Sequence, residues 1–250
     1  MIKGLYTGAS GMLAAQTQSE VIADNVANIR TPGYKAEDTS NKAFPELLMV
    51  RTRTENEPPG NTIIGTMGTG VVVDQISRLN VQGALQTTNL STDLALTSEN
   101  TFFVVNTPNG ERYTRNGQFE LNANGMLQTA EGYQVLGEGG PIGPLSKDFQ
   151  VDSQGVITDQ GVYVDRLRLV EIPAESLTRE GQSLYFSDQA QVYEGNPGVL
   201  QGALESSNVD LTGQMVKMIT VMRAYEANQK VIQTQDATLD KAVNEIGKIV

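Results

Sequence analysis

The sequence predicts an α+β protein in which long helices at the two ends of the chain flank a mainly antiparallel β domain. Small or apolar residues recur at helical spacing near the N-terminus, apolar residues do so over a longer stretch near the C-terminus, and closely spaced turn signals punctuate the middle. Because helices repeat every 3.6 residues and strands every two, each pattern indicates one kind of element. We expect a discontinuous helical domain of residues 1–33 and 205–250, an extended connector of residues 34–75, and a β-rich outer domain of residues 76–204.

The first predicted helix carries a stripe of small and apolar residues at a spacing of three and four. The stripe comprises Leu5, Gly8, Met12, Ala15, Ser19, Ile22, Val26 and Ile29. Its end is expected at Thr31-Pro32-Gly33, because proline disfavours helical geometry in the residue before it. Gly8 and Gly11 each cost about 1 kcal/mol relative to Ala inside a helix, so this helix needs a partner.

The second predicted helix is longer and keeps a four-three spacing from Leu211 to Val250. The positions that suit a buried seam of coiled-coil type are Leu211, Met215, Met218, Met222, Tyr225, Ile232, Leu239, Val243 and Ile246. Asn208 or Asp210 is expected to cap its start. A helix of this length spans on the order of 60 Å, far more than the usual helix of a globular domain.

The middle of the chain contains short β-like runs separated by turn signals. The turns Asn109-Gly110, Asn116-Gly117, Asn124-Gly125 and Glu131-Gly132 lie seven or eight residues apart, near the runs 101–105 and 111–115. Asn-Gly supplies the positive φ angles that tight hairpins need, so we expect hairpins here and a β barrel or sandwich overall. The connector is rich in glycine and proline, and its path is not predicted.

The composition excludes several kinds of chemistry. The chain of 250 residues has no cysteine and no histidine, which removes disulfides, thiolate metal sites and imidazole catalysis. Of the net charge of -11, residues 1–33 contribute 0 and residues 205–250 contribute -1, so the middle holds -10. An acidic middle argues against nucleic acid as a partner. We expect no cleavable signal peptide, no membrane insertion, no metal and no cofactor.

The two helical stripes must be buried somewhere, and the choice bears on function. They can pack on each other, on the β domain or on other chains. A compact monomer is one interpretation, but the length of the C-terminal stripe favours assembly. We therefore expect the stripe residues Leu5, Met12, Ile22, Val26 and Ile29 of the first helix, with the seam of the second, to form an assembly interface. Met222→Asp or Leu239→Asp is expected to abolish incorporation, because it would bury an unpaired charge.

Several segments resemble a known family. GLYTGASGMLAAQ followed by DNVANIRTPGYK resembles the N-terminal signature of flagellar rod, hook and hook-associated axial proteins, and LESSNVDLTGQMVKMITVMRAYEANQKVIQTQDATL resembles their C-terminal signature. The middle stretch GALQTTNLSTDLALTSENTFFVV is similar to the β domain of the FlgF/FlgG-like rod proteins. The resemblance covers nearly the whole chain.

The resemblance implies a structural rod subunit in the bacterial flagellar basal body, exported unfolded and assembled into a helical shaft between motor and hook. It implies partners among copies of the chain, other rod and hook proteins, and the rings around the rod, in the periplasm of a diderm envelope. It also adds Asn25 and Asn28, in the turn after the first helix, to the expected interface. Gln214 departs from the family pattern, where an acidic residue is usual, and proximal or distal identity stays open.

Other functions stay as alternatives to this interpretation. Asp148, Asp152, Asp159 and Asp165 could form a carboxylate cluster, although aspartate among β runs is ordinarily a turn former. A hydrolase that uses carboxylates alone would need two of them about 5 to 10 Å apart in a cleft. A monomeric adhesin-like binding module would have protected ends. A hook protein would need a larger outer domain.

Overall fold

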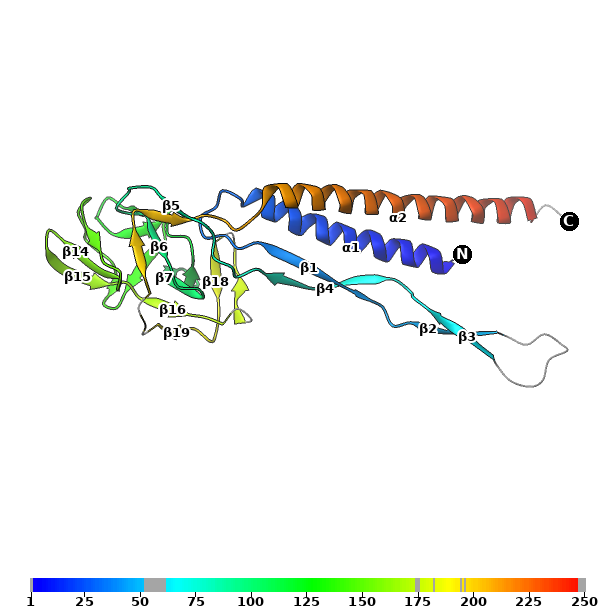
Figure 1. Ribbon diagram of the computed structural model, residues 1–250, viewed down its shortest axis with the longest axis horizontal. Helices are drawn as coiled ribbons and strands as arrows, with labels where there is room; N and C mark the ends of the chain where they lie inside the picture. Colours follow the sequence, from blue (N-terminus) through cyan, green and yellow to red (C-terminus); the bar gives the residue numbers. More distant parts are fainter. Residues whose placement is uncertain are drawn as a thin grey trace. The chain divides into compact units, whose positions relative to one another are not determined.

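The computed structural model describes residues 2–51, 62–173, 176–181, 183–193, 195 and 197–246 of the chain (Figure 1). These residues belong to two compact units. Unit 1 comprises Met1–Val26, Glu37–Ser77 and Leu211–Val250, and unit 2 comprises Ala27–Ala36 and Arg78–Asp210. The protein is therefore of the α+β class, with a helix near each end of the chain and an antiparallel β unit formed by its middle.

Unit 1 contains both helices and two strand pairs (Figure 1). The helices are α1 (Ile2–Ala27) and α2 (Leu211–Ile246), and the strands are β1 (Glu37–Ala43), β2 (Leu47–Arg51), β3 (Thr62–Met67) and β4 (Val71–Arg78). β1 pairs with β4, and β2 pairs antiparallel with β3. The segment whose path the sequence left open thus holds four strands, and residues 52–61 within it lie outside the described residues.

The ends of the helices follow local signals. α1 ends at Ala27, four residues before the expected Thr31, because the N–H of Thr31 bonds the carbonyl of Asn28 at 3.1 Å and closes a turn there. α2 begins directly after Asp210, which therefore occupies the N-cap position as expected. The 36 residues of α2 correspond to about 54 Å at ~1.5 Å per residue.

Unit 2 is built on a curled antiparallel sheet of ten strands (Figure 1). These strands are β7 (Thr101–Thr107), β8 (Gly110–Thr114), β9 (Phe119–Leu121), β10 (Leu127–Thr129), β11 (Gln134–Gly137), β12 (Gly140–Pro141), β16 (Leu169–Glu171), β17 (Thr178–Arg179), β18 (Leu184–Phe186) and β19 (Gln191–Val192). The central path runs β17-β18-β8-β7-β11-β10-β9, with β12 beside β11 and β16 between β7 and β19.

Three smaller ladders complete unit 2. β13 (Gln150–Val151), β14 (Val156–Asp159) and β15 (Val162–Arg166) form a three-stranded sheet. β20 (Val199–Gln201) pairs antiparallel with β6 (Leu94–Leu96), and β21 (Ala203–Glu205) pairs antiparallel with β5 (Leu85–Thr87). The last strands of the β unit in the sequence thus pair with its first strands.

Three of the four predicted hairpin turns are present. Gly110, Gly125 and Gly132 have φ angles of 100°, 75° and 89°, and they lie in the turns of the hairpins β7-β8, β9-β10 and β10-β11. The prediction is wrong for Asn116-Gly117, because β8 and β9 do not pair with each other. Gly117 instead accepts the N–H of Leu94 at 3.0 Å, in a close approach of two backbones.

The core of unit 2 lies on both faces of β7. Phe103 and Val105 face one hydrophobic cluster, while Phe102 and Val104 face another. Phe103 stacks edge-to-face on Phe119 with ring centroids 5.1 Å apart. This explains the uninterrupted apolar run of β7, because a strand covered on both faces has no polar side.

Candidate assembly surface

α1 and α2 pack side by side and antiparallel in unit 1, through the glycines of α1 (Figure 1). A Cβ added to Gly8 would lie 3.1 Å from Ile232 Cγ1, and one added to Gly11 would lie 2.7 Å from Asn228 Nδ2. Any larger side chain at these positions would push the helices apart. The two glycines that weaken α1 by propensity thus allow it to approach α2 closely.

The side of α2 that is covered is shifted from the predicted seam. Its less exposed positions are Gln214, Met218, Val221, Asn228, Ile232, Gln235, Leu239 and Ala242. This set also follows four-three spacing, and it shares Met218, Ile232 and Leu239 with the predicted seam. Met218 accepts a hydrogen bond from Ser19 Oγ at 3.3 Å, within the same unit.

The predicted interface residues therefore fall into two groups. Those buried or half-buried within the chain are Leu5, Met12, Ile22, Asn25, Val26, Asn28, Ile29, Met218, Ile232 and Leu239. Those exposed in this single chain are Leu211, Met215, Met222, Tyr225 and Val243. The side chain of Ile246, like Val250 at the end of the predicted stripe, lies outside the described residues.

Asn25 bonds within its own chain. Its side chain is buried, and its Nδ2 donates to the carbonyl of Glu37 at 2.7 Å while its Oδ1 accepts the N–H of Glu37 at 2.9 Å. The amide thus satisfies both main-chain groups of one residue at the start of β1. This structure gives Asn25 a role in joining α1 to β1.

α2 presents an apolar stripe that stays exposed among the residues that the structure describes. Leu211, Met215, Ile219 and Met222 follow a spacing of four, four and three residues and are 42 to 57% exposed. Ile219 is not among the residues predicted from the sequence, because that prediction follows a single series of positions along the helix, whereas an apolar helix face can be more than 100° wide. Val243 extends the exposed apolar surface toward the C-terminus at 70% exposure.

The β2-β3 ribbon is a second exposed apolar surface, and no sequence pattern predicted it. Its exposed side chains are Leu47, Leu48, Met49, Val50, Ile63 and Ile64. Because neighbouring residues of a strand point to opposite faces, both faces of this ribbon are apolar. An isolated two-stranded ribbon is marginal in water, so this surface needs a cover.

A groove lies between α1 and α2 in unit 1. It encloses about 540 Å³ and is lined by small side chains of α1, including Ala15, Ser19 and Ala23, and by Met222 and Tyr225 of α2. Two of the predicted interface residues thus line a concavity that is wide enough for apolar side chains. Such grooves beside an exposed apolar stripe are typical of surfaces that accept another helix or strand.

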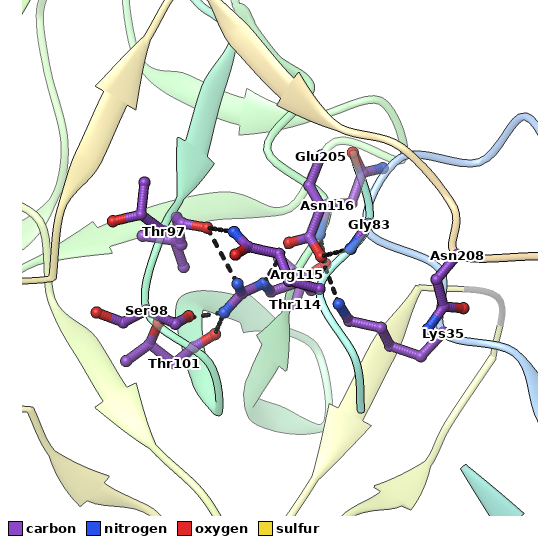
Figure 2. Close-up of polar contacts among 12 residues, drawn as sticks. Lys35, Gly83, Thr97, Ser98, Thr101, Thr114, Arg115, Asn116, Glu205 and Asn208 are labelled. Atoms are coloured by element: carbon purple, nitrogen blue, oxygen red, sulfur yellow. Dashed lines mark hydrogen bonds and ion pairs between the residues drawn. The ribbon is translucent and has the colours of Figure 1, made fainter. Parts of the chain in front are cut away.

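Unit 2 contains a buried ionic cluster that the sequence did not reveal (Figure 2). The carboxylate of Glu205 accepts hydrogen bonds from Lys35 Nζ and from Arg115 Nε, the latter at 2.7 Å. The three residues are 2%, 9% and 4% exposed, in the order Glu205, Lys35 and Arg115. They come from positions 90 and 170 residues apart, so no local pattern could have shown that they meet.

The cluster favours the charged form of its carboxylate. Burial alone would raise the pKa of Glu205, but Arg115 and Lys35 together hold that pKa below its ordinary value. Arg115 Nη1 also donates to the carbonyl of Thr101 at 2.6 Å, and its Nη2 donates to the carbonyl of Leu96 at 3.0 Å. The buried charges are therefore paired and hydrogen-bonded, which such groups require.

The two signature segments of the resemblance meet in unit 2. Tyr34 and Ala36, which follow the turn after α1, form a small apolar cluster with Val209, which precedes α2, and Ile29 packs against it. Asn208 Oδ1 accepts the N–H of Ala36 at 2.6 Å. Ile29, which was expected at the assembly interface, thus packs on this cluster.

Three of the four aspartates that were considered as a carboxylate cluster accept main-chain hydrogen bonds. Asp152 accepts two main-chain N–H groups of its own turn, at 2.8 and 2.9 Å, as expected for a turn former. Asp159 accepts the N–H of Ser146 at 2.9 Å, and Asp165 accepts the N–H of Gly139 at 3.2 Å. Among the residues that the structure describes, no three carboxylates are grouped as a metal site. Neither helix, within its described part, has an apolar stretch long enough to cross a bilayer.

Three parts of the chain match family descriptions of flagellar proteins. Residues 5–35 match "Flagella basal body rod protein", and residues 98–159 match "Flagellar hook protein FlgE/F/G D1 domain". Residues 200–245 match "Flagellar basal body rod FlgEFG protein C-terminal". The first match contains most of α1, and the last contains nearly all of α2, which carries the exposed apolar stripe described above.

Curated relatives match over essentially their whole length. The flagellar hook-basal body complex protein FlhO of Bacillus subtilis (strain 168) is 37% identical, with 100% of each chain covered. The flagellar basal-body rod protein FlgG of the same organism is 33% identical, covering 98% of this chain and 99% of the relative. The flagellar basal-body rod protein FlgF of Caulobacter vibrioides is 32% identical, with 100% of each covered. The chain belongs to the flagellar basal-body rod protein family.

Proposed function

We propose that this chain is a structural subunit of the flagellar rod that polymerises through its terminal helices into the helical shaft between motor and hook. The observation that carries the proposal is the uncovered apolar stripe Leu211, Met215, Ile219 and Met222 on α2. The exposed part of each of these side chains would contribute about 1 kcal/mol when buried. The stripe lies in the family-matched C-terminal region.

We propose that the exposed residues expected from the sequence, together with Ile219 and the β2-β3 ribbon, contact other subunits, while the buried ones, such as Ile22 and Asn25, hold α1 in place within the chain. The stripe of α2 and the ribbon are different surfaces of one chain. When different surfaces of identical subunits meet, the contact is heterologous, and it generates an open helical array unless the rotation closes a ring. Such an array is what a rod requires.

The domain boundaries expected from the sequence are part of the proposal. Residues 1–33 and 205–250 would form the assembly domain with coiled-coil-like contacts, 34–75 the connector, and 76–204 the outer domain, whose curled sheet would act as a half-open barrel. The partners would be copies of this chain, other rod and hook proteins, and rings around the rod. The chain would reach the cell envelope by flagellar export, and the rod would span the periplasm in a diderm cell.

The relatives carry the names of structural rod and hook-basal body proteins, and the chain is a structural protein rather than an enzyme. A hydrolase based on carboxylates has no support from these relatives. Limited proteolysis of the purified chain distinguishes a monomeric binding module from a rod subunit. Ends that are cut long before unit 2 support assembly, and ends that resist as long as unit 2 support the monomer.

Met222→Asp tests the proposed interface most directly. Met222 is 57% exposed in the single chain, so the substitution should leave its fold intact, while burial of a charge at a subunit contact should prevent incorporation. Ala227→Asp is the matched control, because Ala227 is exposed and lies five residues away, roughly 140° around the helix. We expect loss of motility and of the protein from isolated basal bodies only for Met222→Asp. Normal motility of that variant would refute the proposal.

A further inference from the structure

Three segments of unit 2 that are far apart in the sequence converge on Glu205. One is the segment after α1, which contains Gly33 and Lys35, the second contains Gly83, and the third contains Arg115 at the end of the β7-β8 hairpin (Figure 2). Glu205 itself is the last residue of β21. All four segments lie in unit 2, so the convergence is a property of that unit alone.

The carboxylate and the main-chain carbonyl of Glu205 together reach all three of these segments. Its carboxylate accepts Lys35 Nζ, Arg115 Nε at 2.7 Å and the N–H of Gly83 at 2.9 Å. Its main-chain carbonyl accepts the N–H of Gly33 at 2.7 Å. A single residue thus ties down three separate parts of the chain.

The converging backbones are in direct contact, without side chains between them. A Cβ added to Gly33 would lie 2.5 Å from the carbonyl oxygen of Arg115, and Gly33 has a φ angle of 70°. A Cβ added to Gly83 would lie 1.9 Å from the carbonyl oxygen of Ser206. Gly33 and Gly83 thus let these backbones meet without a side chain between them.

Because Arg115 is buried, the packing of these segments around Glu205 depends on charge. The guanidinium is 4% exposed and donates to the carbonyls of Thr101 and Leu96, inside the sheet. Without Glu205, both Arg115 and Lys35 would be buried cations that lack a counterion, which proteins strongly disfavour. The segments are therefore expected to stay apart, with water around Arg115 and Lys35, until the carboxylate of Glu205 is in place.

Glu205 also comes late in the chain. The strands that carry it back to the start of unit 2 are late as well, since β20 and β21 pair with β6 and β5. From these contacts we infer that Glu205 is a closing latch: as long as Lys35 and Arg115 must be buried, unit 2 cannot complete its fold without the Glu205 carboxylate. Because a chain is synthesised from its N-terminus, residues 27–204 remain incompletely folded until Glu205 has emerged.

This delay has a use that rests on the proposed function. A subunit that must pass through an export channel unfolded benefits when its β unit stays open until synthesis is nearly complete. The latch itself does not depend on assembly, because it concerns contacts within unit 2. Its test can therefore fail or succeed independently of the test of Met222.

Refolding of the full-length chain tests the latch. Wild type, Glu205→Gln and the control Glu120→Gln, at an exposed glutamate of β9, are diluted from denaturant. Pulsed hydrogen exchange read by mass spectrometry then follows protection of peptides from β6 to β8 and of residues 199–205. In the wild type we expect both regions to gain protection in one phase. Glu205→Gln should slow this phase about 100-fold, because the latch forms in the rate-limiting step, while Glu120→Gln should leave it unchanged.

A triple variant, Lys35→Met with Arg115→Met and Glu205→Leu, keeps the test decisive if Glu205→Gln does not fold. It removes the buried charges together, so most of the wild-type folding rate should return. Three results would overturn the inference: a wild-type rate for Glu205→Gln, protection of β7 and β8 before residues 199–205 in the wild type, or a triple variant that folds no better than Glu205→Gln.

Discussion

The buried amide of Asn25 offers a quantitative test of how α1 is joined to β1. Asn25→Ala removes two hydrogen bonds, of 2.7 and 2.9 Å, and leaves the N–H and the carbonyl of Glu37 without these partners. An unsatisfied buried polar group costs about 1 to 3 kcal/mol. Glu37 is only half-buried, so water can replace part of the loss, and we expect the free energy of unfolding to fall by about 2 kcal/mol.

The measurement is equilibrium denaturation of the purified chain, followed by circular dichroism. Asn41→Ala is the matched control, because Asn41 lies exposed in β1, and its substitution should change stability by less than about 0.5 kcal/mol. If Asn25 acted only at a subunit interface, its substitution would leave the stability of the purified chain unchanged. If Asn25→Ala leaves the monomer as stable as wild type but blocks assembly, the reasoning from its intrachain hydrogen bonds is refuted.

Two further predictions concern the helix contact and the buried cluster. Gly8→Leu should lower the free energy of unfolding of unit 1 by about 1 to 2 kcal/mol in the same assay, because overpacking against Ile232 outweighs a gain of about 1 kcal/mol in helix propensity. Unchanged stability would contradict this, because it would mean that α1 and α2 separate easily. The pKa of Glu205 is depressed by its two cationic partners, so its contribution is complete above the unfolded pKa of about 4.3 and is lost as pH falls through the folded value. The stability gap between wild type and Glu205→Gln should therefore narrow in acid, and a gap that is constant down to pH 2 would contradict this assignment.

Local sequence patterns predicted much of the secondary structure. The start of α2 after Asp210 and three of the four hairpin turns are where the sequence placed them, and the predicted run 101–105 lies within β7. These features depend on contacts between residues close in sequence, such as helix caps and positive φ angles in turns. Asn116-Gly117 does not form a hairpin, because Gly117 instead accepts a hydrogen bond from the backbone of Leu94, which is not a neighbour in the sequence.

The predicted assembly seam shows where periodicity stops being informative. Two sets of positions on α2 both follow four-three spacing, and they share Met218, Ile232 and Leu239. One set faces α1 and the other, with Met215 and Met222, is exposed. Spacing along one helix cannot distinguish the side covered by the chain itself from the side left for a partner, since both sides carry apolar residues at the same spacing.

The sequence by itself determined the α+β class, the two helices, the antiparallel character of the middle and the absence of thiol and imidazole chemistry. Only the tertiary structure decided that the glycines of α1 face α2, that residues 47–51 and 62–67 form an exposed apolar ribbon, and that Lys35 and Arg115 share the carboxylate of Glu205. The physical reason is the separation along the chain of the residues that interact. Helices and turns are specified by neighbours in the chain, whereas packing faces and buried ion pairs depend on segments that can be 170 or more residues apart, and these become neighbours only when the chain folds.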